Sequence, residues 1–164
     1  MVSKEIFRKL ALFSNFSDGE LEKLGALFTV REFGSGQLIN SEGAENREVI
    51  ILLEGSVAVE MSSSLRDSSE PLVLSTESTP GRIIEWSNAI DSTRSGGTAL
   101  SRAVDPSKVL AADGAAVKAL CDGDIGLGYK FIQQIALVIA SRLRDTRTQF
   151  LSACSQFWWP EGRQ

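Results

Sequence analysis

Glycines divide residues 29–112 into short apolar segments, and this spacing constrains the fold more than any other feature of the chain. They stand at positions 34, 36, 43, 55 and 81, and the segments between and around them include TVREF, REVIILLEG and SVAVEM. In SVAVEM the apolar residues alternate, as they do along a strand with one buried face. No long helical segment separates these runs, so the pattern disfavours a doubly wound parallel sheet and favours a sandwich or barrel.

Helical patterns lie on both sides of this β region. Residues 3–28 carry apolar residues at steps of three or four, and the stretch SNFSDGELEKL contains a capping box, with Ser17 as N-cap and Glu20 three residues later. DGAAVKALCDGD predicts a short helix after residue 112, and residues 125–151 predict a long one. The expected fold class is therefore α+β, mainly β, with N-terminal helices and a long C-terminal helix.

The long helix is apolar on more than one face. One set of apolar residues recurs at three-to-four steps, and a second set widens the stripe: Ile132, Ile135, Ile139 and Leu143, then Phe131, Leu137 and Val138. One face can pack on the sheet, which leaves Phe131, Leu137 or Val138 to be covered by a partner. The near-heptad steps suit a coiled-coil seam, so we expect a homodimer through helix 125–151.

The composition places the chain among soluble globular domains. Its 164 residues fit one domain, with 43% hydrophobic and 23% charged residues. The formal net charge of −4 argues against direct DNA binding, because phosphate neutralisation needs a basic face. The apolar runs are too short to cross a bilayer, and MVSKEIFRKLALF lacks the apolar core of a signal peptide. We therefore expect a cytoplasmic protein with no membrane association.

The residue types present argue against catalysis. The chain has no histidine, which removes the commonest general base, the Ser-His and Cys-His pairs and every His-containing metal site. Cys121 and Cys154 lack the spacing of a redox or metal motif, and we expect two reduced, partly buried thiols. The chain is thus predicted not to be an enzyme and to hold no metal.

The glycine register and its flanking apolar residues resemble the cyclic nucleotide-binding domain of catabolite-activator regulators, cyclic-nucleotide-gated channels and kinase regulatory subunits. The resemblance covers roughly residues 8–150 and rests on two motifs, one with Phe33, Gly36, Ile39 and Gly43 and one with Ile51, Leu53, Gly55, Val57 and Val59. It implies an antiparallel β-roll of the jelly-roll type with a ligand pocket inside it. It also implies that a cyclic nucleotide is the possible ligand, and no other cofactor is expected.

The stretch PGRIIEWSNAI, residues 80–90, lies where the family keeps its phosphate-binding cassette. In the family a Gly-Glu pair precedes a short helix, and an Arg-x-Ala-Thr run follows about ten residues later. Here Glu85 stands at the position of that Gly and Trp86 at that of the ribose-binding Glu. The second run reads Gly97, Thr98, Ala99 and Leu100, so the phosphate-binding Arg is replaced by Gly97.

These replacements predict an altered site. Glu85 would place a carboxylate at the helix N-terminus, where it can bond the free backbone N–H groups as phosphate does elsewhere. Trp86 either packs in the roll and fills the ribose space or forms an aromatic floor for another ligand. Arg94 is the nearest remaining cation. The other candidate pocket residues are Ile84, Ser87 and Asn88 of the same turn and Thr146, which falls near a base-contacting hydroxyl of the family.

Two functions from different classes follow. The chain is a degenerate, non-catalytic regulatory module closed by its own side chains, or it is a sensor that binds a cyclic nucleotide or another small anion through non-standard contacts. We divide the chain into a cyclic nucleotide-binding-like domain, residues 1–151, and an aromatic tail, residues 152–164, without a helix-turn-helix. Phe157, Trp158 and Trp159 of the tail either dock on the domain or anchor a protein partner.

Overall fold

A computed structural model of the chain describes residues 1–41, 47–61, 71–91 and 99–157. The N-terminal part is helical, with α1 (Lys4–Arg8), the 3₁₀ helix η1 (Ala11–Phe13) and α2 (Asp18–Leu27). The capping box predicted at α2 is confirmed, because the Ser17 hydroxyl accepts from the Glu20 N–H and the Glu20 carboxylate accepts from the Ser17 N–H. Phe7 contacts both Phe13 and Phe28 edge to face, and the three buried rings help to fill the core of this part.

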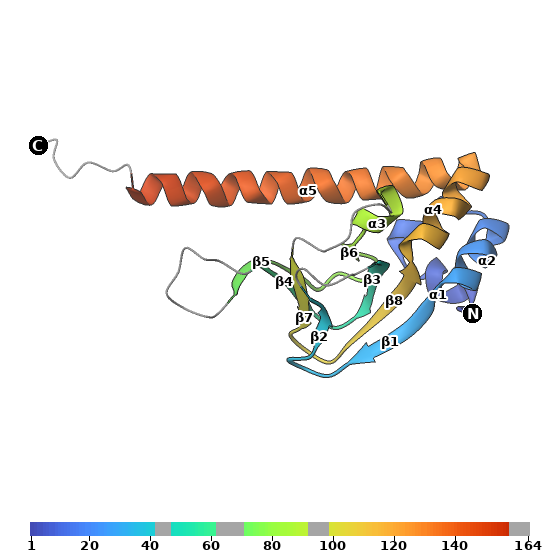
Figure 1. The fold of residues 1–164 in the computed structure, drawn as a ribbon, viewed down its shortest axis with the longest axis horizontal. Coiled ribbons are helices and arrows are strands. Elements are labelled where there is room, and N and C mark those ends of the chain that lie inside the picture. Colours follow the sequence, from blue (N-terminus) through green and yellow to red (C-terminus); the bar gives the residue numbers. More distant parts are fainter. Residues whose placement is uncertain (42–46, 62–70, 92–98, 158–164) are drawn as a thin grey trace, which may run out of the picture.

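The β region forms two four-stranded antiparallel sheets (Figure 1). The first has the order β1-β8-β3-β6 and the second the order β2-β7-β4-β5. The strands are β1 (Thr29–Phe33), β2 (Leu38–Asn40), β3 (Glu48–Glu54), β4 (Val57–Met61), β5 (Leu72–Glu77), β6 (Ile83–Glu85), β7 (Leu100–Ala103) and β8 (Ser107–Asp113). This antiparallel roll confirms the fold class and the β region predicted for residues 29–112.

Alternation along β3 places its side chains in two different cores. Val49 and Ile51 face the helices, whereas Ile50 and Leu52 face the interior of the roll, and all four are fully buried. Residues on both sides of this central strand are apolar because neither face meets water. The continuous run REVIILLEG therefore reflects a strand with two buried faces, unlike a strand with one solvated face.

Gly55 makes the turn from β3 to β4 possible. Its φ is +93°, a backbone conformation that strains other residues, and an added Cβ would lie 2.5 Å from the carbonyl oxygen of Pro106. The glycine register of the sequence thus marks a real close approach of two backbone segments. Gly43, another member of that register, lies outside the described residues.

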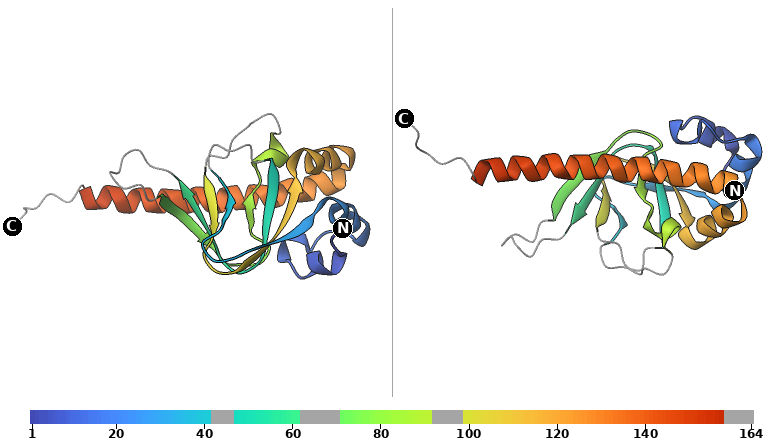
Figure 2. Two further views of the ribbon diagram at one scale, coloured as in Figure 1. Left: turned by 60° about the horizontal axis from the view of Figure 1, so that its bottom comes forward. Right: turned by 90° about the horizontal axis from the view of Figure 1, so that it is seen from above.

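Three helices follow or interrupt the strands: α3 (Ser87–Ile90), α4 (Gly114–Gly123) and α5 (Ile125–Phe157). The 33-residue α5 runs along the roll from the helical end to the far side (Figures 1 and 2) and ends six residues beyond the predicted Leu151. No helix among the described residues combines the length and apolar character that crossing a bilayer requires. The aromatic residues Trp158 and Trp159 and the side chain of Phe157 lie outside the described part.

The face of α5 that packs on the domain differs in part from the expected one. Leu127, Phe131, Ile135 and Val138 are buried there, so the expectation that Phe131 or Val138 needs cover from a partner is wrong. Steps of four, four and three residues keep these side chains on one side of the helix. Leu137 is 64% exposed, as expected.

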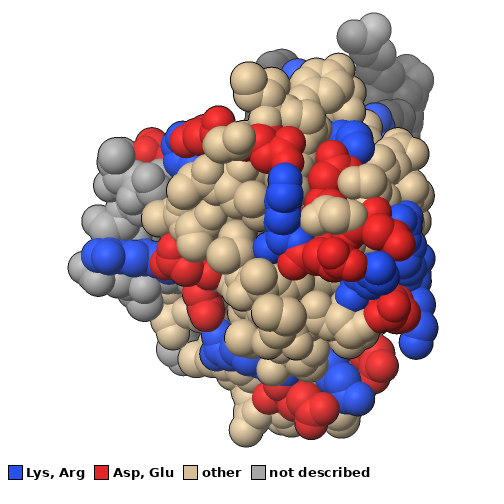
Figure 3. All heavy atoms as spheres, turned by 90° about the vertical axis from the view of Figure 1, so that its right-hand side faces the viewer, with Lys and Arg blue, Asp and Glu red and all other residues tan. Residues whose placement is uncertain are grey.

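Ion pairs connect the helices at the helical end of the molecule. Lys130 on α5 bonds both carboxylate oxygens of Glu20 on α2, at 2.9 and 2.8 Å, and Lys23 pairs with Asp124 at 2.6 Å. Acidic and basic side chains are interspersed over this end (Figure 3). The visible face therefore lacks the single-sign basic patch that binding of a nucleic-acid backbone uses.

Candidate functional site

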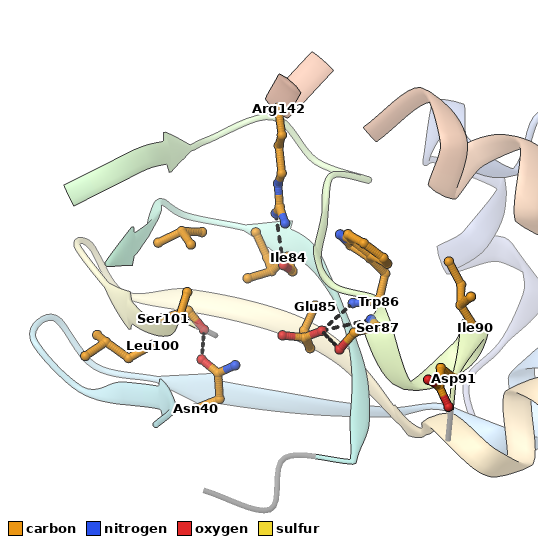
Figure 4. A pocket seen from close by; sticks show the side chains of 12 residues that line it. Asn40, Ile84, Glu85, Trp86, Ser87, Ile90, Asp91, Leu100, Ser101 and Arg142 are labelled. Carbon is orange, nitrogen blue, oxygen red and sulfur yellow. Dashed lines mark hydrogen bonds between the residues drawn. The ribbon is translucent and has the colours of Figure 1, made fainter. Parts of the chain in front are cut away.

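A cavity of about 400 Å³ opens between the roll, α3 and α5 (Figure 4). Its volume lies within the range of small-molecule pockets. Strands of both sheets contribute to it, as do the α3 turn and one residue of α5. The described lining residues are Asn40, Val59, Ile84, Glu85, Trp86, Ser87, Ile90, Asp91, Ala99, Leu100, Ser101 and Arg142.

Glu85 lies at the end of β6 and caps the start of α3. Its Oε1 accepts hydrogen bonds from the backbone N–H of Trp86 and of Ser87, both at 2.9 Å, and from the Ser87 hydroxyl at 2.6 Å. The N-cap residue Trp86 makes no side-chain capping bond of its own. The carboxylate thus satisfies N–H groups that a four-residue helix leaves unpaired.

Trp86 lies between the cavity and the helical core. Its side chain is partly buried against the core cluster of the helices and also lines the cavity. Ile84, one residue before Glu85, belongs to the interior core of the roll. The cavity therefore has an aromatic and an aliphatic wall beside the polar turn.

Arg142 is the functional candidate that sequence reasoning missed. It reaches from α5 to the free edge of β6, where its Nη2 donates to the carbonyl oxygens of Ile83 and Ile84 at 3.1 and 2.9 Å (Figure 4). A signal was available, because Arg142 follows Val138 by one helical step of four and so falls on the face toward the roll. Among the described lining residues it is the only lysine or arginine.

The position of Arg142 also affects its ionisation. Burial lowers the pKa of its guanidinium, and Arg82 acts in the same direction, whereas the carboxylates of Glu77 and Glu85 raise it. Its Nε is buried and has no hydrogen-bond partner. Arg82 itself is paired with Glu77 at 2.8 Å.

The structure brings together six of the predicted site residues around the cavity: Ile84, Glu85, Trp86, Ser87, Ala99 and Leu100. Asn88 is 5% exposed and packs against Gly114, away from the lining. Thr146 is exposed on α5 and is not among the lining residues. Arg94, Gly97 and Thr98 lie outside the described residues. Asn40 and Ser101, which sequence reasoning did not select, line the opposite wall and are hydrogen-bonded to each other.

Comparison with solved structures identifies the fold. A cyclic nucleotide-binding domain from Methylobacillus flagellatus KT superposes with a TM-score of 0.74 at 20% identity, over 92% of this chain and 82% of the other. The sensor domain of the transcriptional regulator DNR from Pseudomonas aeruginosa gives 0.67 at 14% identity, over 86% and 91%. The catabolite activator protein of Thermus thermophilus gives 0.66 at 20% identity, over 88% of this chain and 62% of that protein.

These similarities show that the chain has the fold of cyclic nucleotide-binding domains, which confirms the fold implied by the sequence resemblance. No protein-family model matches the sequence, and no curated protein matches it. At these identities the comparison establishes the fold, whereas the ligand must be argued from the residues of the cavity.

Proposed function

We propose that the chain is a non-catalytic regulatory module of the cyclic nucleotide-binding fold whose cavity does not take cyclic AMP or cyclic GMP in the family's manner. The observation that carries the proposal is the bonding of Glu85. Its carboxylate already accepts from the N–H groups at the start of α3. A cyclic phosphate at the same place would meet a like charge, and two unit charges about 4 Å apart repel by roughly 1–4 kcal/mol in a polar environment.

A single described cation, Arg142, faces two carboxylates in the lining and so offsets this repulsion only in part. The Nη2 of Arg142 donates to the β6 carbonyls, and Arg82 is paired with Glu77. Asp91 adds a second carboxylate to the lining. The described lining thus holds two acidic groups and one basic group, which is the reverse of a phosphate site.

Calorimetry with cyclic AMP and cyclic GMP tests the proposal. We expect dissociation constants above about 100 μM, which corresponds to less than about 5.5 kcal/mol of binding free energy. Glu85→Gln keeps an oxygen acceptor for α3 but removes the charge, so it should tighten binding of either nucleotide. Asp145→Asn removes the same charge from the exposed face of α5 and serves as the matched control.

Micromolar binding by the unaltered protein would contradict this proposal and favour the alternative, a cyclic nucleotide sensor with non-standard contacts. Arg142 or Arg94 would then have to contact the phosphate. Substituting the arginine that does so should abolish binding, whereas Arg144→Gln, on the exposed side of α5, should leave it unchanged.

The module is also proposed to form a homodimer through α5. A row of exposed residues recurs in alternating steps of four and three along this helix: Ile125, Tyr129, Ile132, Ala136, Ile139, Leu143, Thr146 and Phe150. This is the a/d pattern of a coiled coil, and it adjoins the face that packs on the roll. Thr146, predicted as a base contact, lies in this seam. For the aromatic tail both predictions stay open, docking on the domain itself and anchoring a protein partner.

A further inference from the structure

Glu85 and Arg142 are oppositely charged residues of the cavity lining, and each is held in place by only one of its polar atoms. Glu85 uses Oε1 for all three of its hydrogen bonds, to Trp86 and Ser87. Arg142 uses Nη2 for both of its bonds, to Ile83 and Ile84. No residue of the described part is bonded to Glu85 Oε2 or to Arg142 Nη1. Each group is therefore oriented by the protein and retains a free hydrogen-bonding atom.

Glu85 and Arg142 do not bond to each other, although they line one cavity. Figure 4 shows Arg142 entering from α5 and Glu85 at the α3 turn, with Ile84 between them. They are close enough for the Glu85 charge to raise the pKa of Arg142, against the larger lowering by burial. The pair thus presents a separated positive and negative group across a space that a small molecule can enter.

The rest of the lining favours a ligand with an apolar part. Val59, Ile84 and Leu100 supply aliphatic walls, and the Trp86 indole lies beside Glu85. An aromatic side chain beside a carboxylate suits a ligand ammonium group attached to a hydrocarbon.

We propose that this cavity binds a small zwitterion of the amino-acid type, with its ammonium group at Glu85, its carboxylate at Arg142 and its apolar side chain against Trp86 and Ile84. This inference rests on the proposed function, because it requires a cavity that does not take a cyclic phosphate. A simple anion would supply a charged partner only to Arg142, and a simple amine would supply one only to Glu85. A ligand that carries both charges supplies a charged partner to each group, and hydrogen bonds between charged groups are stronger than neutral ones.

Thermal-shift measurements with the standard L-amino acids, followed by calorimetry, test the inference on the full chain. At least one apolar amino acid should stabilise the protein and bind. Its amine analogue, which lacks the carboxylate, and its carboxylic-acid analogue, which lacks the amino group, should each bind at least about tenfold more weakly, because each loses a bond to a charged group. These analogues need no altered protein, so the test does not depend on whether a variant folds.

Two variants test which residue binds the ammonium group of the ligand and which binds its carboxylate. In Glu85→Gln the amino acid should lose its advantage over the carboxylic-acid analogue, and in Arg142→Gln it should lose its advantage over the amine. Asp145→Asn should change neither preference. Thermal unfolding of each variant without ligand shows whether it is folded at the temperature of the calorimetry.

The outcomes separate this inference from the proposed function. If no amino acid binds, or if an analogue with one charge binds as tightly as the amino acid, the inference is overturned, and the proposed function is unaffected as long as cyclic nucleotides also fail to bind. Micromolar binding of cyclic AMP in the same titrations overturns both.

Discussion

Two isoleucines one helical turn apart on α5 provide the sharpest test of how this helix is used. Ile135 is 1% exposed and belongs to the helical core, whereas Ile139 is 37% exposed and lies in the proposed seam. Ile135→Ala should lower the free energy of unfolding by about 2–5 kcal/mol, the usual range for truncating a buried aliphatic side chain. Ile139→Ala should change the stability of the monomer by no more than about 0.5 kcal/mol.

The same pair of variants distinguishes folding from association. If a two-fold seam buries Ile139 in both copies, its truncation removes about 1–2 kcal/mol per copy at roughly 0.8 kcal/mol per methylene equivalent. The dimer dissociation constant should then rise about 30- to 1,000-fold. Urea unfolding at several protein concentrations measures the first effect, and sedimentation measures the second.

Two results would contradict these roles of Ile135 and Ile139. If Ile139→Ala destabilises the monomer as much as Ile135→Ala does, α5 packs on the roll through a different face. If the unaltered protein sediments as a monomer at micromolar concentration, the seam does not form at that concentration, and the exposed row on α5 must be covered in another way.

Three further predictions concern the rest of the domain. Gly55→Ala should destabilise the protein by more than about 1 kcal/mol in urea unfolding, because φ is positive and the Cβ meets Pro106; Gly19→Ala, in open space on α2, should stabilise it by about 0.4–1 kcal/mol. The hydrogen bond from Lys130 lowers the pKa of Glu20 in the folded protein. The stabilisation that this bond gives the folded state is therefore fully present above the ordinary pKa of 4.5 and is lost as the pH falls through the lower folded pKa. Glu20→Gln should make unfolding less dependent on pH in that range, and an unchanged dependence would contradict the assignment. Burial raises the pKa of Cys121 to about 11, so alkylation at pH 8 should be slow in the folded protein and fast in urea.

Local chemistry explains which parts of the fold were predictable. The capping box at Ser17 depends on residues three positions apart, and the turn at Gly55 needs a positive φ that glycine adopts readily, so both occur in the structure as expected. The apolar run of β3 predicted a buried strand because each of its two faces meets a hydrophobic core. The side of α5 that packs on the roll was harder to predict from the sequence. The helix carries two apolar rows, and only the position of the sheet decides that Phe131 and Val138 are buried.

The candidate site also has one part that the sequence predicted and another that it did not. The order of residues in PGRIIEWSNAI was enough to predict that the Glu85 carboxylate would lie beside the N–H groups of Trp86 and Ser87, because all three are neighbours in one turn. Arg142 comes 57 positions after Glu85 in the chain, and Asn40 comes 45 positions before Glu85. Their places around the cavity follow from the closure of the roll and the path of α5 across it.

The sequence by itself therefore determined the strands, the turns that need glycine and the acidic cap of α3, since these depend on contacts within a few residues. Only the tertiary structure decided which cation lines the cavity, which row of α5 stays exposed and where Thr146 lies. Those features depend on how a helix is rotated against a sheet that is assembled from distant segments, and neither periodicity nor local bonding specifies that rotation when several faces of the helix are apolar.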